Sequence, residues 1–290
     1  MQAPRQGRWS ATFFEAGFAI LLFAGACALE FAASALAPPA AAAVPSSPSK
    51  RVSSSSSDVP RQAAAASGTP VLVELFTSEG CSSCPPADRL LARLAADQPV
   101  AGALVVPLSL HVDYWNRLGW VDPFSSAAFT ERQGAYAARF GNGGRVYTPQ
   151  MVVDGLAELV GSDERAARRA IAASATGTKA LVKIEAGAVP GSARVTVSGA
   201  PGAGADVVLA VAEDAGVSEV TRGENAGTRL THVAVAREIR VLGTVDGGGR
   251  FGGNIALTAL RGTGPRHLLA FVQEPGTGRV LGASVPFRAP

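Results

Sequence analysis

The chain has 290 residues, 47% of them hydrophobic, and a formal net charge of +3 at neutral pH. This length supports one large domain or two ordinary domains, each with a buried core. The charge excess is small and the Lys and Arg residues are scattered, which argues against a dedicated nucleic-acid binder with a basic stripe.

The first 35 residues have the pattern of an export signal. Arg5 and Arg8 precede an apolar run at residues 16–29, and small residues at 33–35 would serve as a cleavage site. The run is shorter than the roughly 20 residues of a spanning helix and fits a signal peptide. We therefore expect an exported protein, periplasmic or secreted. An uncleaved anchor or a lipidated Cys27 are the alternatives, and only these would make the membrane a partner.

Residues 36–68 form a stretch rich in Ala, Pro and Ser, with five consecutive serines. Such a composition cannot bury enough apolar surface to offset the entropy lost on ordering the chain. We expect a disordered linker here, and ordered structure from residue 69 onward.

Residues 69–176 show the alternation of strand and helix signals that is typical of an α/β domain. Apolar, β-branched runs of strand length alternate with stretches of helical apolar spacing. The expected elements are a strand at 70–76, a helix at 87–95, a strand at 104–112, a helix at 125–140, a hairpin turning at 154–155 and a helix at 162–176. This β-α-β-α-β-β-α order implies parallel strands in the first half and an antiparallel pair at the hairpin.

Residues 179–290 contain no convincing helical pattern. Short alternating segments such as ARVTVSG and HLLAFVQ are separated by Gly and Pro. This pattern predicts a separate all-β, sandwich-like domain.

The segment FTSEGCSSCPPAD, residues 76–88, carries Cys81 and Cys84. Removal of the export signal would leave these as the two cysteines of a protein in an oxidising compartment. A disulfide between them closes a very short loop and stabilises the fold little, which weakens a purely structural role. The first sulfur would lie at a helix N-terminus, where free N–H groups and the helix dipole favour a thiolate. We therefore predict that Cys81 is the better-exposed nucleophile and Cys84 the resolving thiol.

The element order, with this CxxC between the first strand and the first helix, resembles the thioredoxin superfamily. The approach FTSEGCSSC is most similar to the glutaredoxin pattern. That superfamily places a cis-proline, often after Thr, just before its third core strand, and Thr148 and Pro149 hold this position. The resemblance implies that Thr148 and Pro149 face the dithiol and that an incoming peptide pairs with the backbone before the proline.

A closer resemblance covers residues 70–285. The segments VELFTSEGCSSCPPAD, HVDYWNRLGWVDPF, YTPQMVVDG and GENAGTRLTHVAV are similar to exported bacterial proteins grouped as domain-of-unknown-function family 1223. The resemblance implies a thioredoxin-like fold, a β-rich C-terminal part and export. Asn116 and residues 231–236 depart from the family pattern.

Three further features leave alternatives open. His111, Asp113, Tyr114 and Trp115 follow the second strand, where ligands collect in α/β folds, and either line a substrate groove or form a packed loop. Glu74 either relays protons to Cys84 or is a surface or Arg-paired residue. Residues 223–232, GENAGTRLTH, either fold back over the dithiol or form an ordinary Gly-rich turn.

The leading hypothesis is a thiol–disulfide oxidoreductase that acts on a protein or a small thiol or disulfide substrate, with no cofactor and no resident metal. One alternative is a copper- or zinc-handling protein that uses Cys81, Cys84 and His111. The other is a non-enzymatic binding module that uses the C-terminal β-domain for a partner.

Overall fold

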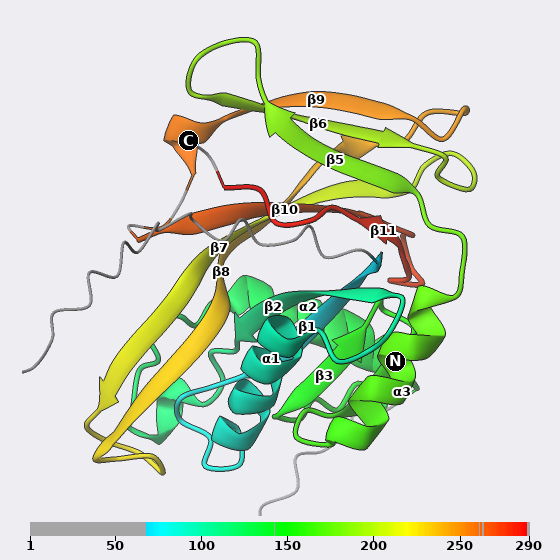
Figure 1. The fold of residues 1–290 in the computed structure, drawn as a ribbon. Coiled ribbons are helices and arrows are strands. Elements are labelled where there is room, and N and C mark those ends of the chain that lie inside the picture. The colour runs from blue at the N-terminus through cyan, green and yellow to red at the C-terminus, as the bar shows by residue number, and fades with distance from the viewer. Residues whose placement is uncertain (1–67, 142, 261, 263, 289–290) are drawn as a thin grey trace, which may run out of the picture. The chain divides into compact units, whose positions relative to one another are not determined.

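The computed structural model describes residues 68–141, 143–260, 262 and 264–288. The expected export signal, and all of the expected linker except Gly68, lie outside these residues. In the described part of the chain, an eight-stranded mixed sheet carries helices on both faces, and a second sheet has three strands (Figure 1). The predicted mixed α/β class is confirmed. No helix in these ranges is long and apolar enough to span a bilayer.

The first half of the chain has the predicted order of elements. They are β1 (Thr69–Thr77), α1 (Pro85–Asp97), β2 (Ala103–His111), the 3-10 turn η1 (Asn116–Leu118), α2 (Ala127–Arg139), β3 (Gln150–Val153), β4 (Ala157–Val160) and α3 (Glu164–Ala175). Strand β1 pairs parallel with β2 and antiparallel with β3, and β3 pairs with β4 in a hairpin.

Strand β1 is buried on both of its faces because helices cover both sides of the sheet. Leu72 and Phe76 belong to the core beneath α2, whereas Val71, Val73 and Leu75 belong to the core beneath α1 and α3. Such double burial explains why β1 reads as a near-continuous apolar run rather than a strict alternation.

The helices begin at residues suited to the first turn. Helix α1 has prolines in its first turn, where amide donors are not needed, and it ends at Gln98 in the left-handed conformation. Ser126 caps α2 by accepting from the backbone N–H of Ala128. Asp163 caps α3 by accepting from the backbone N–H of Ala166, one residue after the expected start at 162. The observed starts therefore lie within two residues of the expected ones.

The second half of the chain consists of strands. They are β5 (Leu181–Ala186), β6 (Ser192–Ser198), β7 (Asp206–Val220), β8 (Thr228–Thr244), β9 (Phe251–Ala256), β10 (Arg266–Gln273) and β11 (Val280–Ala283), with the 3-10 turn η2 (Leu257–Ala259). The order in the large sheet is β11-β10-β7-β8-β2-β1-β3-β4, and β5-β6-β9 form the small sheet.

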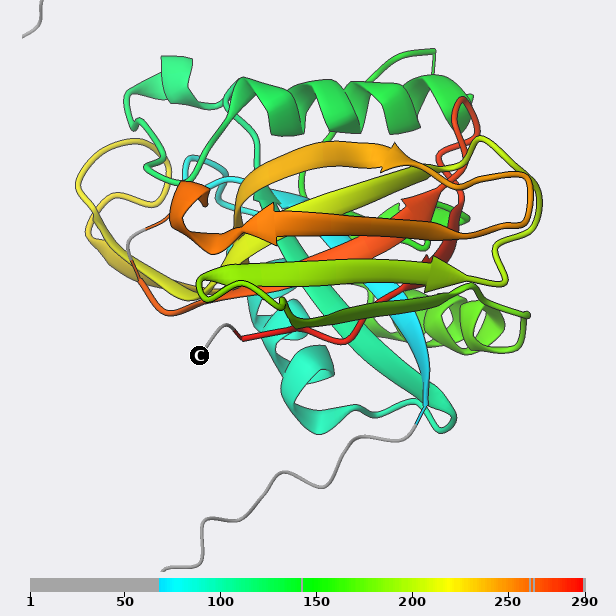
Figure 2. The same ribbon diagram turned by 90° about the horizontal axis from the view of Figure 1, so that it is seen from above.

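The C-terminal strands differ from the sequence expectation in one respect. Strand β8 pairs parallel with β2 at Val235 and Ser109, so β7, β8, β10 and β11 extend the first sheet instead of building a separate one. The small sheet packs on this extension through a shared core that includes Val195, Val207 and Leu268 (Figure 2). The packing is sandwich-like, but the boundary expected near residue 177 runs through one continuous large sheet. Alternation along a strand does not encode which neighbour the strand joins.

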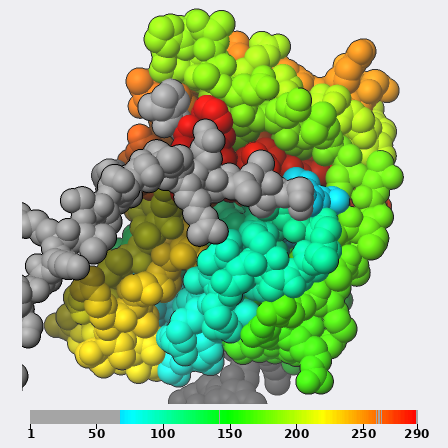
Figure 3. All heavy atoms as spheres, in the orientation of Figure 1, coloured from blue at the N-terminus to red at the C-terminus, as the bar shows by residue number. Residues whose placement is uncertain are grey.

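Strands β7 and β8 extend beyond their neighbours in the large sheet as a hairpin. We call its distal part, residues 214–234 with a tip at 221–227, the arm. The register shifts between Val211 and Ala212, and Ala234 has a φ of 49°, in the left-handed region. Both irregularities bend the hairpin at the base of the arm. The arm lies beside α1, where Figure 3 shows the yellow hairpin against the cyan helix.

Candidate functional site

The CSSC turn joins β1 to α1 and places two thiols side by side. Cys84 is the N-cap residue of α1, and the N–H of Cys84 donates to the carbonyl of Cys81. Both cysteines are free, and their sulfur atoms are 2.6 Å apart, with the Cys84 thiol donating to Cys81. Cys81 is only 1% exposed and Cys84 is fully buried. Both thiols are buried, so exposure hardly separates the predicted nucleophile Cys81 from the predicted resolving thiol Cys84.

The pKa values do separate them. The pKa of Cys81 falls from 9.0 to about 6, chiefly because the Cys84 thiol donates a hydrogen bond to it; burial opposes the shift, and Ser83 and Thr148 add to it. Burial raises the pKa of Cys84 far above its ordinary value, and the neighbouring Cys81 and Asp88 raise it further. At neutral pH the pair therefore holds one proton, on Cys84, and Cys81 is the thiolate.

Thr148 faces the dithiol, as predicted. The Thr148–Pro149 peptide bond is cis. The Thr148 hydroxyl donates to Cys81 Sγ at 3.4 Å, and the Thr148 carbonyl oxygen lies 3.9 Å from the same sulfur. The indole N–H of Trp115 donates to Thr148 Oγ1 at 2.8 Å. Trp115 thus holds the hydroxyl that stabilises the Cys81 thiolate.

The HVDYW segment is divided between two environments. Trp115 and Tyr114 lie toward the dithiol. Burial raises the pKa of Tyr114 to about 12, and the charges of both cysteines add smaller contributions. Asp113 accepts from the hydroxyl of Thr130 at 2.6 Å and so ties its loop to α2. Of the predicted groove residues, two belong to the dithiol environment and Asp113 belongs to a packed loop.

The remaining residue of this segment, His111, belongs to a cluster that the sequence did not indicate. We call it the buried ionic group, and its members are Glu79, Asp88, His111, Asp122 and His232. His111 Nδ1 lies 2.7 Å from Asp122 Oδ2, and the His111 ring contacts the His232 ring edge-on with centroids 4.5 Å apart. Asp122 also accepts from the N–H of Glu79 at 2.9 Å. The group therefore lies directly under the CSSC turn.

His232 lies between two carboxylates of this group. Its Nε2 is 3.1 Å from Glu79 Oε1, and its Nδ1 is 3.7 Å from Asp88 Oδ1. Burial alone would lower the pKa of His232, but the two carboxylates outweigh it and raise the pKa to about 9. Trp120 donates its indole N–H to Glu79 Oε2 at 2.8 Å. The imidazolium thus balances charge that would otherwise be isolated in the interior.

Residues 223–232 fold back over the dithiol, which is one of the two alternatives left open by the sequence. Glu224 Oε2 accepts from the N–H of Ser82 at 2.9 Å. The side-chain amide of Asn225 donates to the carbonyls of Glu79 at 2.8 Å and Cys81 at 3.0 Å. The tip of the arm is therefore bonded to the turn that carries the reactive thiol.

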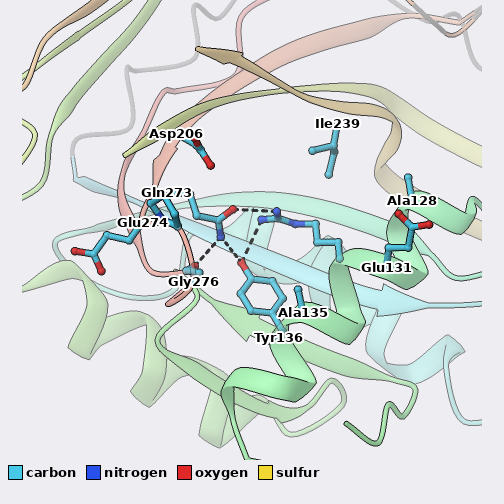
Figure 4. A pocket seen from close by; sticks show the side chains of 12 residues that line it. Ala128, Glu131, Ala135, Tyr136, Asp206, Ile239, Gln273, Glu274 and Gly276 are labelled. Atoms are coloured by element: carbon cyan, nitrogen blue, oxygen red, sulfur yellow. Dashed lines mark hydrogen bonds between the residues drawn. The ribbon is translucent and has the colours of Figure 1, made fainter. Parts of the chain in front are cut away.

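Glu74 has a different role from a proton relay to Cys84. It is fully buried and pairs with Arg132 at 2.6 Å, and it accepts from the hydroxyl of Tyr136 at 2.7 Å. Gln273 joins the network from β10, and a cavity of about 390 Å³ opens beside it between α2, β7 and β8 (Figure 4). This is the Arg-paired alternative, on the α2 side of the sheet.

The structure does not bring a metal-binding set together. Among the residues it describes, there is no group of three or more His, Cys, Asp or Glu side chains arranged to hold a metal ion. His111 is bonded to Asp122 through Nδ1 rather than grouped with Cys81 and Cys84.

A family model described as "Protein of unknown function (DUF1223)" matches residues 72–273, which include the CSSC turn, the cis-proline and the arm. The chain belongs to the DUF1223 family.

A solved structure is similar to this DUF1223 chain. It is the crystal structure of a protein from Agrobacterium tumefaciens, a structural genomics target, with 28% sequence identity and a TM-score of 0.63. The match covers 76% of this chain and 95% of that one, so it includes most of the fold. No curated protein matches the chain.

The site of this DUF1223 protein can perform one kind of chemistry directly. A thiolate at Cys81 with a protonated thiol beside it can attack a sulfur atom and then be released by its neighbour. The sequence pointed to Cys81, Cys84, Thr148 and Pro149, but it missed Asp88 and Asp122. For Asp88 a signal existed, because a residue four positions after Cys84 lies on the same face of a helix.

Proposed function

We propose that this protein is an exported, thioredoxin-like thiol–disulfide oxidoreductase whose reactive pair is Cys81 and Cys84. The observation that carries the proposal is the division of roles between two adjacent sulfurs, one held as a thiolate with a pKa of about 6 and the other held protonated. The order of elements, the CxxC between β1 and α1, and the cis-proline beside it support the thioredoxin-like assignment. Export rests on the N-terminal sequence pattern.

The exchange proceeds in two balanced steps. The Cys81 thiolate attacks one sulfur of a substrate disulfide, the bond from Cys81 to that sulfur forms, and the substrate S–S bond breaks with release of a thiolate. Cys84 then passes its proton to the released substrate thiolate through solvent and attacks Cys81 Sγ, which breaks the bond between Cys81 and the substrate. The intramolecular disulfide forms, and the second substrate thiolate leaves. Two electrons pass from the dithiol to the substrate, and the reverse sequence oxidises a substrate dithiol.

The local charges favour this order of events. While Cys81 is a thiolate, its negative charge helps to keep the pKa of Cys84 high. Formation of the mixed disulfide removes that charge, so the pKa of Cys84 falls only when its attack is needed. Asp88 remains as the carboxylate whose charge acts on Cys84.

The test is to trap the intermediate. Cys84→Ser should accumulate a mixed disulfide through Cys81 when the reduced protein meets a small disulfide such as bis(2-hydroxyethyl) disulfide, detected as the added mass. The matched variant Cys81→Ser should accumulate little, because Cys84 is fully buried and burial keeps its pKa raised even without the Cys81 charge. Equal trapping by the two variants, or trapping by neither, refutes the proposal.

A further inference from the structure

The reactive thiol is enclosed although the turn that carries it is at the surface. Ser82 and Ser83 are exposed, yet the side chain of the preceding Cys81 is only 1% exposed. A disulfide exchange needs the attacking sulfur within about 3–3.5 Å of its target and in line with the bond that breaks. What surrounds Cys81 therefore decides which disulfides can react.

One side of the enclosure comes from the loop after β2 and from the cis-proline segment. Trp115 packs so closely that a Cβ on Gly80 would lie 3.2 Å from the Trp115 Cβ. Thr148, held by Trp115, presents both its hydroxyl and its carbonyl oxygen to Cys81 Sγ. These groups are already occupied by contacts within the protein.

The other side comes from the tip of the arm. Asn225 is 8% exposed and bridges two carbonyls of the turn, one of them that of Cys81 itself. Glu224 is exposed and binds the outer N–H of the turn at Ser82. At the base of the arm, Ala234 has a φ of 49°. The tip thus covers the edge of the turn at Ser82, directly beside the residue that carries the reactive thiol.

We propose that Glu224 and Asn225 are specificity-determining residues that restrict Cys81 to low-molecular-mass disulfides and exclude the disulfides of folded proteins. The inference rests on the proposed oxidoreductase function and names the substrate class of that site. A sulfur on a thin, flexible chain needs less room beside Cys81 than a sulfur in a folded protein does. A cystine embedded in a folded backbone collides with the tip. Exclusion by an obstacle is a common way to reject one class of partner without stronger binding of another.

The test compares two disulfides in single-turnover reactions of the reduced protein. Bis(2-hydroxyethyl) disulfide is the small probe and insulin the protein probe, and the rate constant for loss of free thiols is measured with each. The double variant Glu224→Ala/Asn225→Ala should raise the ratio of the insulin rate to the small-disulfide rate at least about tenfold. Glu224→Ala alone, at an exposed residue, should raise it in the same direction and covers the case in which the double variant does not fold.

A matched control lies on the same arm. Glu219 is exposed and pairs with Arg229, and Glu219→Ala should leave the ratio unchanged. A ratio that is the same in the wild type and in both tip variants overturns the specificity role while leaving the oxidoreductase proposal intact. If the wild type reacts with neither disulfide although iodoacetamide alkylates Cys81, the oxidoreductase proposal itself fails, and this inference fails with it.

Discussion

The hydrogen bond from Cys84 to Cys81 is the largest cause of the lowered pKa of Cys81. With a pKa of about 6, Cys81 is roughly 90% ionised at pH 7, against about 1% for a thiol at the ordinary 9.0. Cys84→Ala removes the donor. A hydrogen bond to a charged group is worth about 1.5–3 kcal/mol, so the pKa of Cys81 should rise by about one to two units. Cys84→Ser keeps a donor at the same place and should leave the pKa near 6.

The assay is the rate of iodoacetamide alkylation of Cys81 as a function of pH, followed by mass spectrometry. The midpoint should move upward in Cys84→Ala and stay in Cys84→Ser. Intrinsic nucleophilicity rises with pKa with a Brønsted slope of about 0.4–0.5, so the plateau rate of Cys84→Ala at high pH should exceed that of Cys84→Ser by roughly three- to tenfold. The two curves should therefore cross. A midpoint near 9.0 in Cys84→Ser, or equal shifts in the two variants, would show that the hydrogen bond from residue 84 does not set the pKa of Cys81.

Three further predictions concern the buried charges and one turn. The folded pKa of His232, about 9, lies above its ordinary 6.5, so protonated His232 stabilises the folded state fully below pH 6.5 and this stabilisation is lost as the pH rises through 9. The wild type should therefore exceed His232→Gln in unfolding free energy by an amount that shrinks by up to about 3 kcal/mol from pH 6 to 10. A difference that stays constant with pH in denaturant titrations would contradict this. Glu74→Gln leaves the charge of Arg132 uncompensated and should lower the free energy of unfolding in urea at pH 7 by about 3 kcal/mol. A decrease below about 1 kcal/mol would show that the Glu74–Arg132 pair contributes little to stability. Gly155→Ala would place a Cβ 1.9 Å from the carbonyl oxygen of Gly278, at a φ of 60°, so its melting temperature should fall by several degrees, and an unchanged value would show that the two loops separate freely.

Local features of the site were readable from the sequence. The CSSC turn is recognisable from the spacing of its cysteines and from the prolines in the first turn of the helix. The Thr148–Pro149 peptide bond is cis at the position that the resemblance implied. These features depend on a few consecutive residues, whose conformation is set by local sterics and hydrogen bonding. The mixed α/β class followed in the same way from alternating patterns along the chain.

Long-range features were not readable in the same way. His232 meets Asp88 and Glu79 across more than 140 positions, and nothing in a periodic pattern records such a meeting. The pairing of β8 with β2 at Val235 and Ser109 is likewise a long-range contact that no local sequence pattern records. Cys81 is buried partly because the extended sheet places the tip of the arm against the CSSC turn. The prediction that Cys81 is the better-exposed thiol considered the CSSC turn alone and could not include the arm that covers it.

The reduction potential of the Cys81–Cys84 pair decides whether this dithiol can exchange with substrates. The purified protein is equilibrated with glutathione or dithiothreitol buffers, and the oxidised fraction is read by thiol labelling. A thiolate held at Cys81 stabilises the reduced form, so the account predicts a reversible disulfide with a potential between about −270 and −120 mV. A potential below about −300 mV would make the pair a structural disulfide, and failure to form any disulfide would remove the oxidoreductase function altogether.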